Sequence, residues 1–187
     1  IDDKTVRLWD ANGWKPVRTF TGIETSISCL VFSPNGEFLA SSGRNASLEE
    51  AHLMIWEVGT GKTVLSIKQG YDSYRGLAFS ADGRAIMTTG EKAKNDYIYP
   101  INVLDVSTGD TIQSIKGPDQ SMLAIASTRD GKHFFVTDSG RNISMYDSAT
   151  KQRVYSAMRI SGMPVGPAIS PDGSCIAIGC GDNFNIG

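Results

Sequence analysis

The chain has 187 residues, with 18 Lys and Arg against 20 Asp and Glu, so its formal net charge is −2. Forty per cent of the residues are apolar, which is too many for a disordered chain, and the even charge balance disfavours nucleic-acid binding. No apolar run approaches the roughly 20 residues of a membrane span, and three cysteines, an odd number, favour reduced thiols and a cytoplasmic location over a secreted disulfide scaffold.

Short segments rich in Ile, Leu, Val and Phe, separated by turn residues, predict β-strands throughout the chain. In chain order the expected strands are Val6–Trp9; Ser26–Phe32, Phe38–Ala40, Leu53–Trp56 and Val64–Ile67; Leu77–Phe79, Ala85–Met87, Ile101–Leu104 and Ile112–Ile115; Met122–Ala126, Phe134–Val136, Ile143–Tyr146 and Val154–Ala157; and Val165–Ile169 with Ile176–Ile178. No segment has a sustained helical period. The sequence therefore predicts an all-β protein whose strands come in groups of four.

Three sets of landmarks recur in phase, about 42 to 48 residues apart, and indicate an internal repeat. The first set is the glycine that ends a turn tetrapeptide, at Gly36, Gly83, Gly131 and Gly173. The second is an apolar or aromatic residue followed by an acidic one, at Trp9, Trp56, Leu104 and Tyr146. The third is a β-branched residue eight positions later, at Val17, Val64, Ile112 and Val154. Because three independent landmarks share one spacing, we interpret the chain as a tandem array.

The repeated pattern resembles the WD40 repeat, both in FSPNGEFLASSG followed by LMIWEVGTGKTVLSI and in DKTVRLWD at Asp3–Asp10. The resemblance implies a β-propeller, in which four-stranded antiparallel blades stack around a channel and neighbouring blades bury each other's faces. It divides residues 1–187, as one partial propeller domain, into a half blade (1–20), three blades (21–68, 69–116 and 117–158) and an incomplete blade (159–187).

The repeats depart from the family at the positions of its buried polar network. The family's histidine after glycine is missing, and its turn aspartate is matched only by Asp3 and Asp182, with Asn45, Lys92 and Gly140 in the other repeats. We therefore expect the blades to be held by apolar packing. The resemblance assigns Trp9 and Trp56 to that packing.

The repeat phase predicts that the chain is a fragment of a larger propeller that lacks two or three blades. The alternative is that the first half blade completes the last one and closes a ring of four blades.

No motif predicts a catalytic, metal or cofactor site. Gly59–Thr63 resembles the end of a P-loop but lacks its first glycine and precedes a strand rather than a helix. Cys175 and Cys180 are not spaced as a zinc pair. His52 is expected in a turn, and His133 is expected to open a second strand. The sequence offers no recognisable nucleophile that either histidine could activate as a general base.

The residues that suggest partner binding lie in the links at one rim of the expected propeller. Two adjacent repeats carry insertions between their second and third strands, and in a propeller these links open on the same face as the links between blades. Tyr and Arg are enriched among the residues that dominate binding energy in protein interfaces. The expected partner-binding residues are Arg44, Glu49, Glu50, His52, Tyr71, Asp72, Tyr74, Arg75, Lys92, Lys94, Tyr97, Tyr99 and Asp119.

These observations favour a non-catalytic protein–protein interaction scaffold that binds a protein or peptide on its loop face, without nucleic acid, membrane or cofactor. The alternative is an accessory propeller region of a larger enzyme or signalling protein, such as a peptidase, kinase or redox protein, with its catalytic part elsewhere. The expected first strands contain no ionisable residue other than Cys29, which argues against chemistry in the channel.

Overall fold

The structure, a computed structural model, describes residues 4–45, 50–70, 74–89, 99–157 and 162–181. All regular secondary structure in these ranges is β, as the strand pattern predicts, and it forms three four-stranded antiparallel sheets and two two-stranded ones. We call the sheets half-blade N, blades 1 to 3, and half-blade C, in chain order.

Each sheet is built from strands that are consecutive in the sequence. Half-blade N contains β1 (Val6–Trp9) and β2 (Pro16–Phe20), and half-blade C contains β15 (Met163–Ile169) and β16 (Ile176–Gly181). Blade 1 contains β3 (Ser26–Phe32), β4 (Phe38–Asn45), β5 (Glu50–Glu57) and β6 (Thr63–Gly70). Blade 2 contains β7 (Leu77–Phe79), β8 (Ala85–Thr89), β9 (Ile101–Asp105) and β10 (Thr111–Ile115). Blade 3 contains β11 (Met122–Ser127), β12 (His133–Asp138), β13 (Ile143–Asp147) and β14 (Arg153–Ala157).

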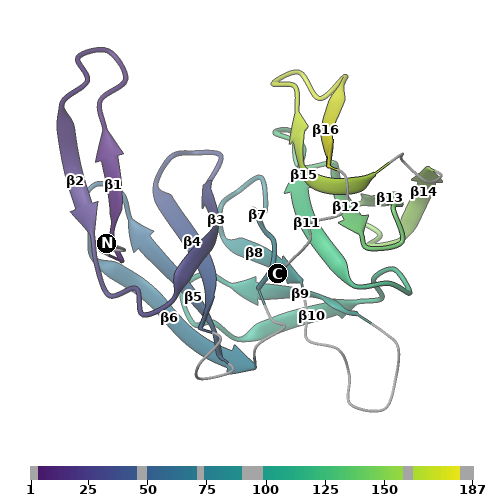
Figure 1. Cartoon of the computed structure of the whole chain (residues 1–187), viewed down its shortest axis with the longest axis horizontal. Helices are drawn as coiled ribbons and strands as arrows, with labels where there is room; N and C mark the ends of the chain where they lie inside the picture. Colours follow the sequence, from purple (N-terminus) through teal and green to yellow (C-terminus); the bar gives the residue numbers. More distant parts are fainter. Residues whose placement is uncertain (1–3, 46–49, 71–73, 90–98, 158–161, 182–187) are drawn as a thin grey trace.

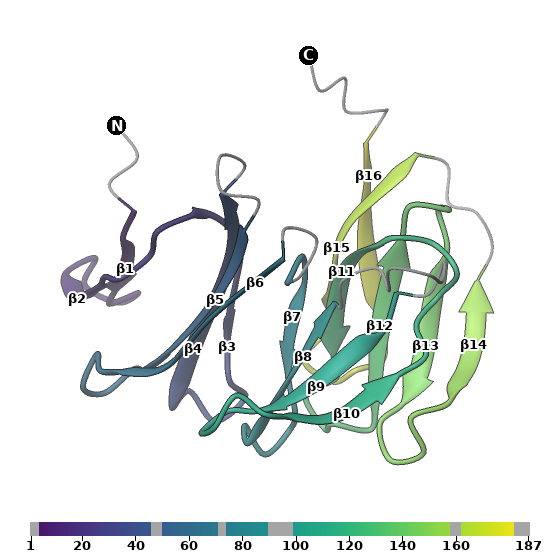
Figure 2. The same cartoon turned by 90° about the horizontal axis from the view of Figure 1, so that it is seen from below.

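The sheets follow one another around an open arc, with half-blade N at one end and half-blade C at the other (Figures 1 and 2). The first strands line the inside of the arc, because β3 contacts β7, β7 contacts β11, and β11 contacts β15. This is the arrangement of WD40-like propeller blades. The alternative of a four-bladed ring is wrong for this structure, because β1–β2 and β15–β16 form separate sheets at opposite ends of the arc.

The hydrophobic core lies between neighbouring sheets in three clusters. Trp56 of blade 1 is buried against half-blade N, where its ring centroid lies 5.5 Å from that of Phe20. A second cluster fills the space between blades 1 and 2, and a third, between blades 2 and 3, includes Phe134 stacked on Tyr146 at a centroid distance of 4.9 Å. Apolar packing therefore joins half-blade N and blades 1 to 3 to one another, and half-blade C contacts blade 3 through β15.

Trp9 differs from the expectation that it packs between blades, because half of its surface is exposed. Its equivalent, Trp56, faces the preceding sheet. In the described part of the chain no sheet lies on that side of half-blade N, so Trp9 stays half exposed.

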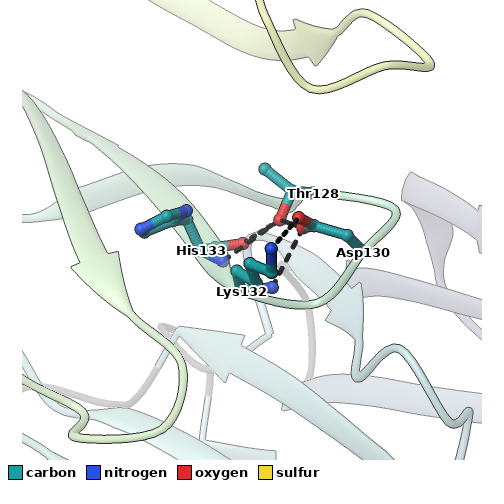
Figure 3. Close-up of polar contacts among 4 residues, drawn as sticks. All are labelled: Thr128, Asp130, Lys132 and His133. Carbon is teal, nitrogen blue, oxygen red and sulfur yellow. Dashed lines mark hydrogen bonds and ion pairs between the residues drawn. The ribbon is translucent and has the colours of Figure 1, made fainter.

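The turns between first and second strands share one hydrogen-bonded design, shown for blade 3 in Figure 3. Thr128 Oγ1 accepts a hydrogen bond from the His133 backbone N–H (3.1 Å) and donates one to Asp130 Oδ1 (2.7 Å). Asp130 Oδ1 in turn accepts from the Lys132 backbone N–H at 3.0 Å. Ser33, Ser80 and Ser170 make the same contacts in the other turns. The glycines that follow, Gly36, Gly83, Gly131 and Gly173, all have positive φ, between 68° and 74°.

Candidate partner-binding rim

One edge of the arc carries the links from second to third strands and the links between successive sheets, and we call this edge the rim. Strand direction places the first-to-second and third-to-fourth turns on the opposite edge, because neighbouring strands in each sheet are antiparallel. Of the residues expected to bind a partner, Arg44, Glu50, Arg75, Tyr99 and Asp119 lie at the rim and are at least partly exposed. Glu49, Tyr71, Asp72, Lys92, Lys94 and Tyr97 lie outside the described residues, as do Asp3 and Asp182.

The first insertion lengthens a hairpin. Strand β4 continues to Asn45 and β5 begins at Glu50, with Arg44 opposite Ala51 in the ladder. His52 is therefore a strand residue, and its expected place in a turn is wrong.

His52 is buried in β5, where its Nε2 lies 2.9 Å from Ser66 Oγ. Burial lowers the pKa of the imidazole, and the nearby Lys68 ammonium lowers it further. The folded protein thus favours the neutral imidazole. Such a side chain belongs to the sheet interior, so its expected exposure to a partner is also wrong.

Tyr74 is also buried, although the sequence places it in a link between blades. Its φ is 60°, its backbone N–H donates to Thr89 O (3.1 Å), and the following N–H of Arg75 donates to Thr89 Oγ1 (2.8 Å). The ring packs in the cluster between blades 1 and 2, and burial raises the pKa of the phenol. Tyr74 is therefore a core residue at the rim, and its expected role as an exposed anchor is wrong.

An ion pair that the sequence analysis missed joins the first inter-sheet link to blade 1. The Lys68 ammonium on β6 donates to the Glu24 carboxylate, and Lys4 Nζ donates to Glu24 O at 3.0 Å. The Lys68 contact lowers the pKa of Glu24 and raises that of Lys68. No local pattern reveals this pair, because its members come from different repeat elements.

A second rim cluster lies on blade 3, at the turn between β12 and β13. Buried Asp138 accepts hydrogen bonds from the Asn142 backbone N–H and side-chain Nδ2, each at 3.1 Å. The Ser139 N–H donates to Ser121 O (2.8 Å), which ties this turn to the link that carries Asp119. Arg141, with a φ of 65°, is exposed beside them. The sequence indicates a turn here, but the link is short and carries no insertion, so Arg141 was not among the expected rim residues.

The first strands line a half-open cavity of about 590 Å³ on the inside of the arc. Its described lining is mostly apolar, and the charged side chains in it are Arg75 and Arg129. No carboxylate or imidazole lines it among the described residues, so these residues supply no acid–base pair for proton transfer. The described residues also contain no group of three or more His, Cys, Asp and Glu arranged to hold a metal ion. In the same ranges no helix is long and apolar enough to cross a membrane.

Comparison with known proteins identifies the repeat. Residues 14–56 match the family described as WD domain, G-beta repeat. The nuclear distribution protein PAC1 of Arthroderma otae is 36% identical over 94 residues, which cover 48% of this chain and 20% of the relative. Transcription initiation factor TFIID subunit 5 of Caenorhabditis elegans is 32% identical over 83 residues, 44% of this chain and 12% of that protein. Pre-rRNA-processing protein IPI3 of Mycosarcoma maydis is 26% identical over 72 residues, 38% of this chain and 11% of the relative. The chain thus spans a fifth or less of the length of these relatives.

Proposed function

Since this chain is a WD40-repeat protein, we propose that it is a non-catalytic scaffold that binds a protein or peptide partner at the rim. The observation that carries this proposal is the rim of blade 3, where Asp119 and Arg141 are exposed on links that hydrogen bonds hold in place. Loops fixed on a rigid scaffold are where proteins usually place recognition residues.

The packing of the blades supports this role. Buried apolar clusters join half-blade N to blade 1, blade 1 to blade 2 and blade 2 to blade 3, so the links of these sheets project from a framework that changes little when a partner binds. Opposite charges, with Glu50 and Asp119 among the acids and Arg44 and Arg141 among the bases, suit a partner that presents both signs. We place this interaction in the cytoplasm, a proposal that the three free cysteines support.

The proposal is tested with peptides selected from a display library against the intact chain. Affinity for the selected peptide is then measured for wild type and for Asp119→Ala, Arg141→Ala and Arg44→Ala. Loss of an anchor weakens binding by more than about fivefold, corresponding to about 1 kcal/mol. The matched control is Asp110→Ala, because Asp110 is exposed in a turn on the opposite edge.

We expect at least one rim variant to exceed that threshold while Asp110→Ala binds like wild type. Unchanged binding by all three rim variants, or a loss confined to Asp110→Ala, would show that recognition lies on another surface.

A further inference from the structure

The turn between the third and fourth strands of blade 3 holds a lysine in a conformation that the other complete blades give to glycine. Lys151 has a φ of 60°, and Gly61 and Gly109, its register equivalents in blades 1 and 2, have φ values of 76° and 78°. In all three turns the N–H of this residue donates to the carbonyl group four positions earlier. Trp14 of half-blade N shares the conformation but is 79% exposed, whereas Lys151 is half-buried. Strain of this kind costs free energy and is concentrated at binding and active sites.

The backbone of this turn directs the lysine side chain towards blade 2. A Cβ on Gly109 would lie 2.7 Å from Ile67 Cδ1 and 2.9 Å from Leu65 Cδ1, on the outer strand of the preceding blade. At the next junction the register equivalent of Leu65 is Gln113, which is polar and exposed. Lys151 therefore has room between blades 2 and 3, where a side chain in place of Gly109 would collide.

Lys151 lines a hollow of about 320 Å³ between blades 2 and 3, at the edge opposite the rim. We call this hollow the notch, and its defining residues are Asp82, Ala85, Met87, Val103, Ser148 and Lys151. Met87 and Val103 belong to the apolar cluster between the two blades and form the floor. Both blades have all four strands. The volume lies at the lower end of the roughly 300 to 1,000 Å³ of small-molecule sites, so the notch suits a small ligand.

The notch reaches this floor because two of its walls are small. Ala85 and Ser148 occupy the register positions that Phe38 and Val106 occupy between blades 1 and 2. That junction also has a hollow, of about 290 Å³, but it ends on Phe38 and Val106 and does not include the strand positions beneath them. The deeper opening is therefore specific to blades 2 and 3 among the complete blades.

Charged groups of opposite sign line the notch. The Lys151 ammonium comes from blade 3 and has no ion-pair partner among the described residues. Asp82 comes from blade 2, where hydrogen bonds from Ser80 Oγ and the Arg84 N–H lower the pKa of its carboxyl and keep it ionised near neutral pH. Both bonds end on Oδ1, so Oδ2 is available to a ligand. One base, one acid and an apolar floor thus share one small hollow.

We propose that the notch binds a free α-amino acid with an apolar side chain. The Lys151 ammonium donates to the α-carboxylate, the Asp82 carboxylate accepts from the α-ammonium, and the ligand side chain packs on Met87 and Val103. The charges favour a zwitterion, because either end of a peptide brings only one of the two charges and an apolar surface brings neither. The inference goes beyond the proposed function and does not depend on it, since the notch lies at the edge opposite the rim.

Titration of the intact chain with leucine, followed by ligand-detected NMR, tests the site. Leucine should bind saturably with a Kd below about 1 mM. Leucinamide lacks the carboxylate and N-acetylleucine lacks the ammonium, so each should bind at least tenfold more weakly. No saturable binding of leucine, methionine or phenylalanine up to about 10 mM would overturn the proposal.

Three variants take their new residues from equivalent positions of other repeats, so each is compatible with the blade fold. Lys151→Gly follows Gly61 and Gly109, Asp82→Asn follows Asn35, and Ala85→Phe combined with Ser148→Val follows Phe38 and Val106. Each variant should weaken leucine binding at least tenfold. The matched control is Lys62→Ala, because Lys62 is exposed in the equivalent turn of blade 1 and does not line the notch. A loss of binding in the control equal to that in Lys151→Gly would contradict the assignment.

The analogues identify which charge each residue contacts. Lys151→Gly should not weaken leucinamide further, and Asp82→Asn should not weaken N-acetylleucine further. A leucine at the C-terminus of a peptide that binds as tightly as free leucine, with no effect of Asp82→Asn, would overturn the zwitterion and assign the notch to a chain end.

Urea unfolding separates binding from a structural role of the lysine. Lys151→Gly relieves the left-handed strain, so its unfolding midpoint should equal or exceed that of wild type while leucine binding is lost. A lower midpoint together with lost binding would assign Lys151 to the stability of the fold and overturn its role in the notch.

Discussion

At the scale of single residues, the turn glycines share a backbone conformation but differ in their surroundings. A Cβ on Gly36 (φ 74°) would have no neighbour within 4 Å, whereas a Cβ on Gly131 (φ 68°) would collide with the methyl group of Ala81. Gly36→Ala should therefore cost only the left-handed backbone strain, about 1 to 2 kcal/mol. Gly131→Ala should cost about 1 to 3 kcal/mol more, from overpacking between blades 2 and 3.

Urea unfolding of the two variants measures this difference. A third variant that combines Gly131→Ala with Ala81→Gly removes the collision and keeps the strain, so its loss of stability should approach that of Gly36→Ala. Equal losses of stability for the two single variants would mean that blade 2 moves away from the added methyl group without a loss of free energy.

His52 supports a prediction about pH. Burial lowers its pKa below the ordinary value of 6.5, so between the two values the unfolded chain binds more protons than the folded one. The free energy of unfolding should therefore decrease as the pH falls from about 7 through 6.5 towards the lowered pKa of His52. Glu24, whose pKa is lowered from 4.5, titrates below this window.

The measurement is urea unfolding at intervals between pH 7 and pH 5 for wild type and His52→Gln. Glutamine can still form a hydrogen bond with Ser66 but does not titrate, so its stability should depend less on pH. Identical pH dependence in the two proteins would show that His52 does not control stability in this range.

At the scale of elements, the local sequence pattern was sufficient to predict the bounds of a strand that lies between two recognisable turns. Val6–Trp9, Ser26–Phe32 and Leu77–Phe79 were predicted with the bounds that the structure has, because alternation or a short apolar run ends at a recognisable turn. The extended hairpin of blade 1 was not predicted. The polar residues that follow Gly43 resemble a loop, and their strand conformation depends on pairing of Arg44 with Ser26 and of Glu50 with Gly70.

The candidate site was harder to predict than the fold, because side-chain direction in a link depends on the backbone. Tyr74 points into the core because its φ of 60° turns the chain, and the residue types on either side of it do not predict that conformation. Arg141 is exposed for a similar reason, in a turn closed by Asp138. Residue type indicated which edge of the blades could bind a partner, but not which of its side chains face outwards.

At the scale of the whole molecule, the distribution of burial predicts where the fold opens first. Leu53, Ile55 and Trp56 on β5 are buried between two neighbouring sheets, whereas β15 and β16 pack on one side only in the described structure. Amides that open only with the whole core exchange slowest. Hydrogen exchange should therefore be slowest in β5 and fastest in β1 and β16.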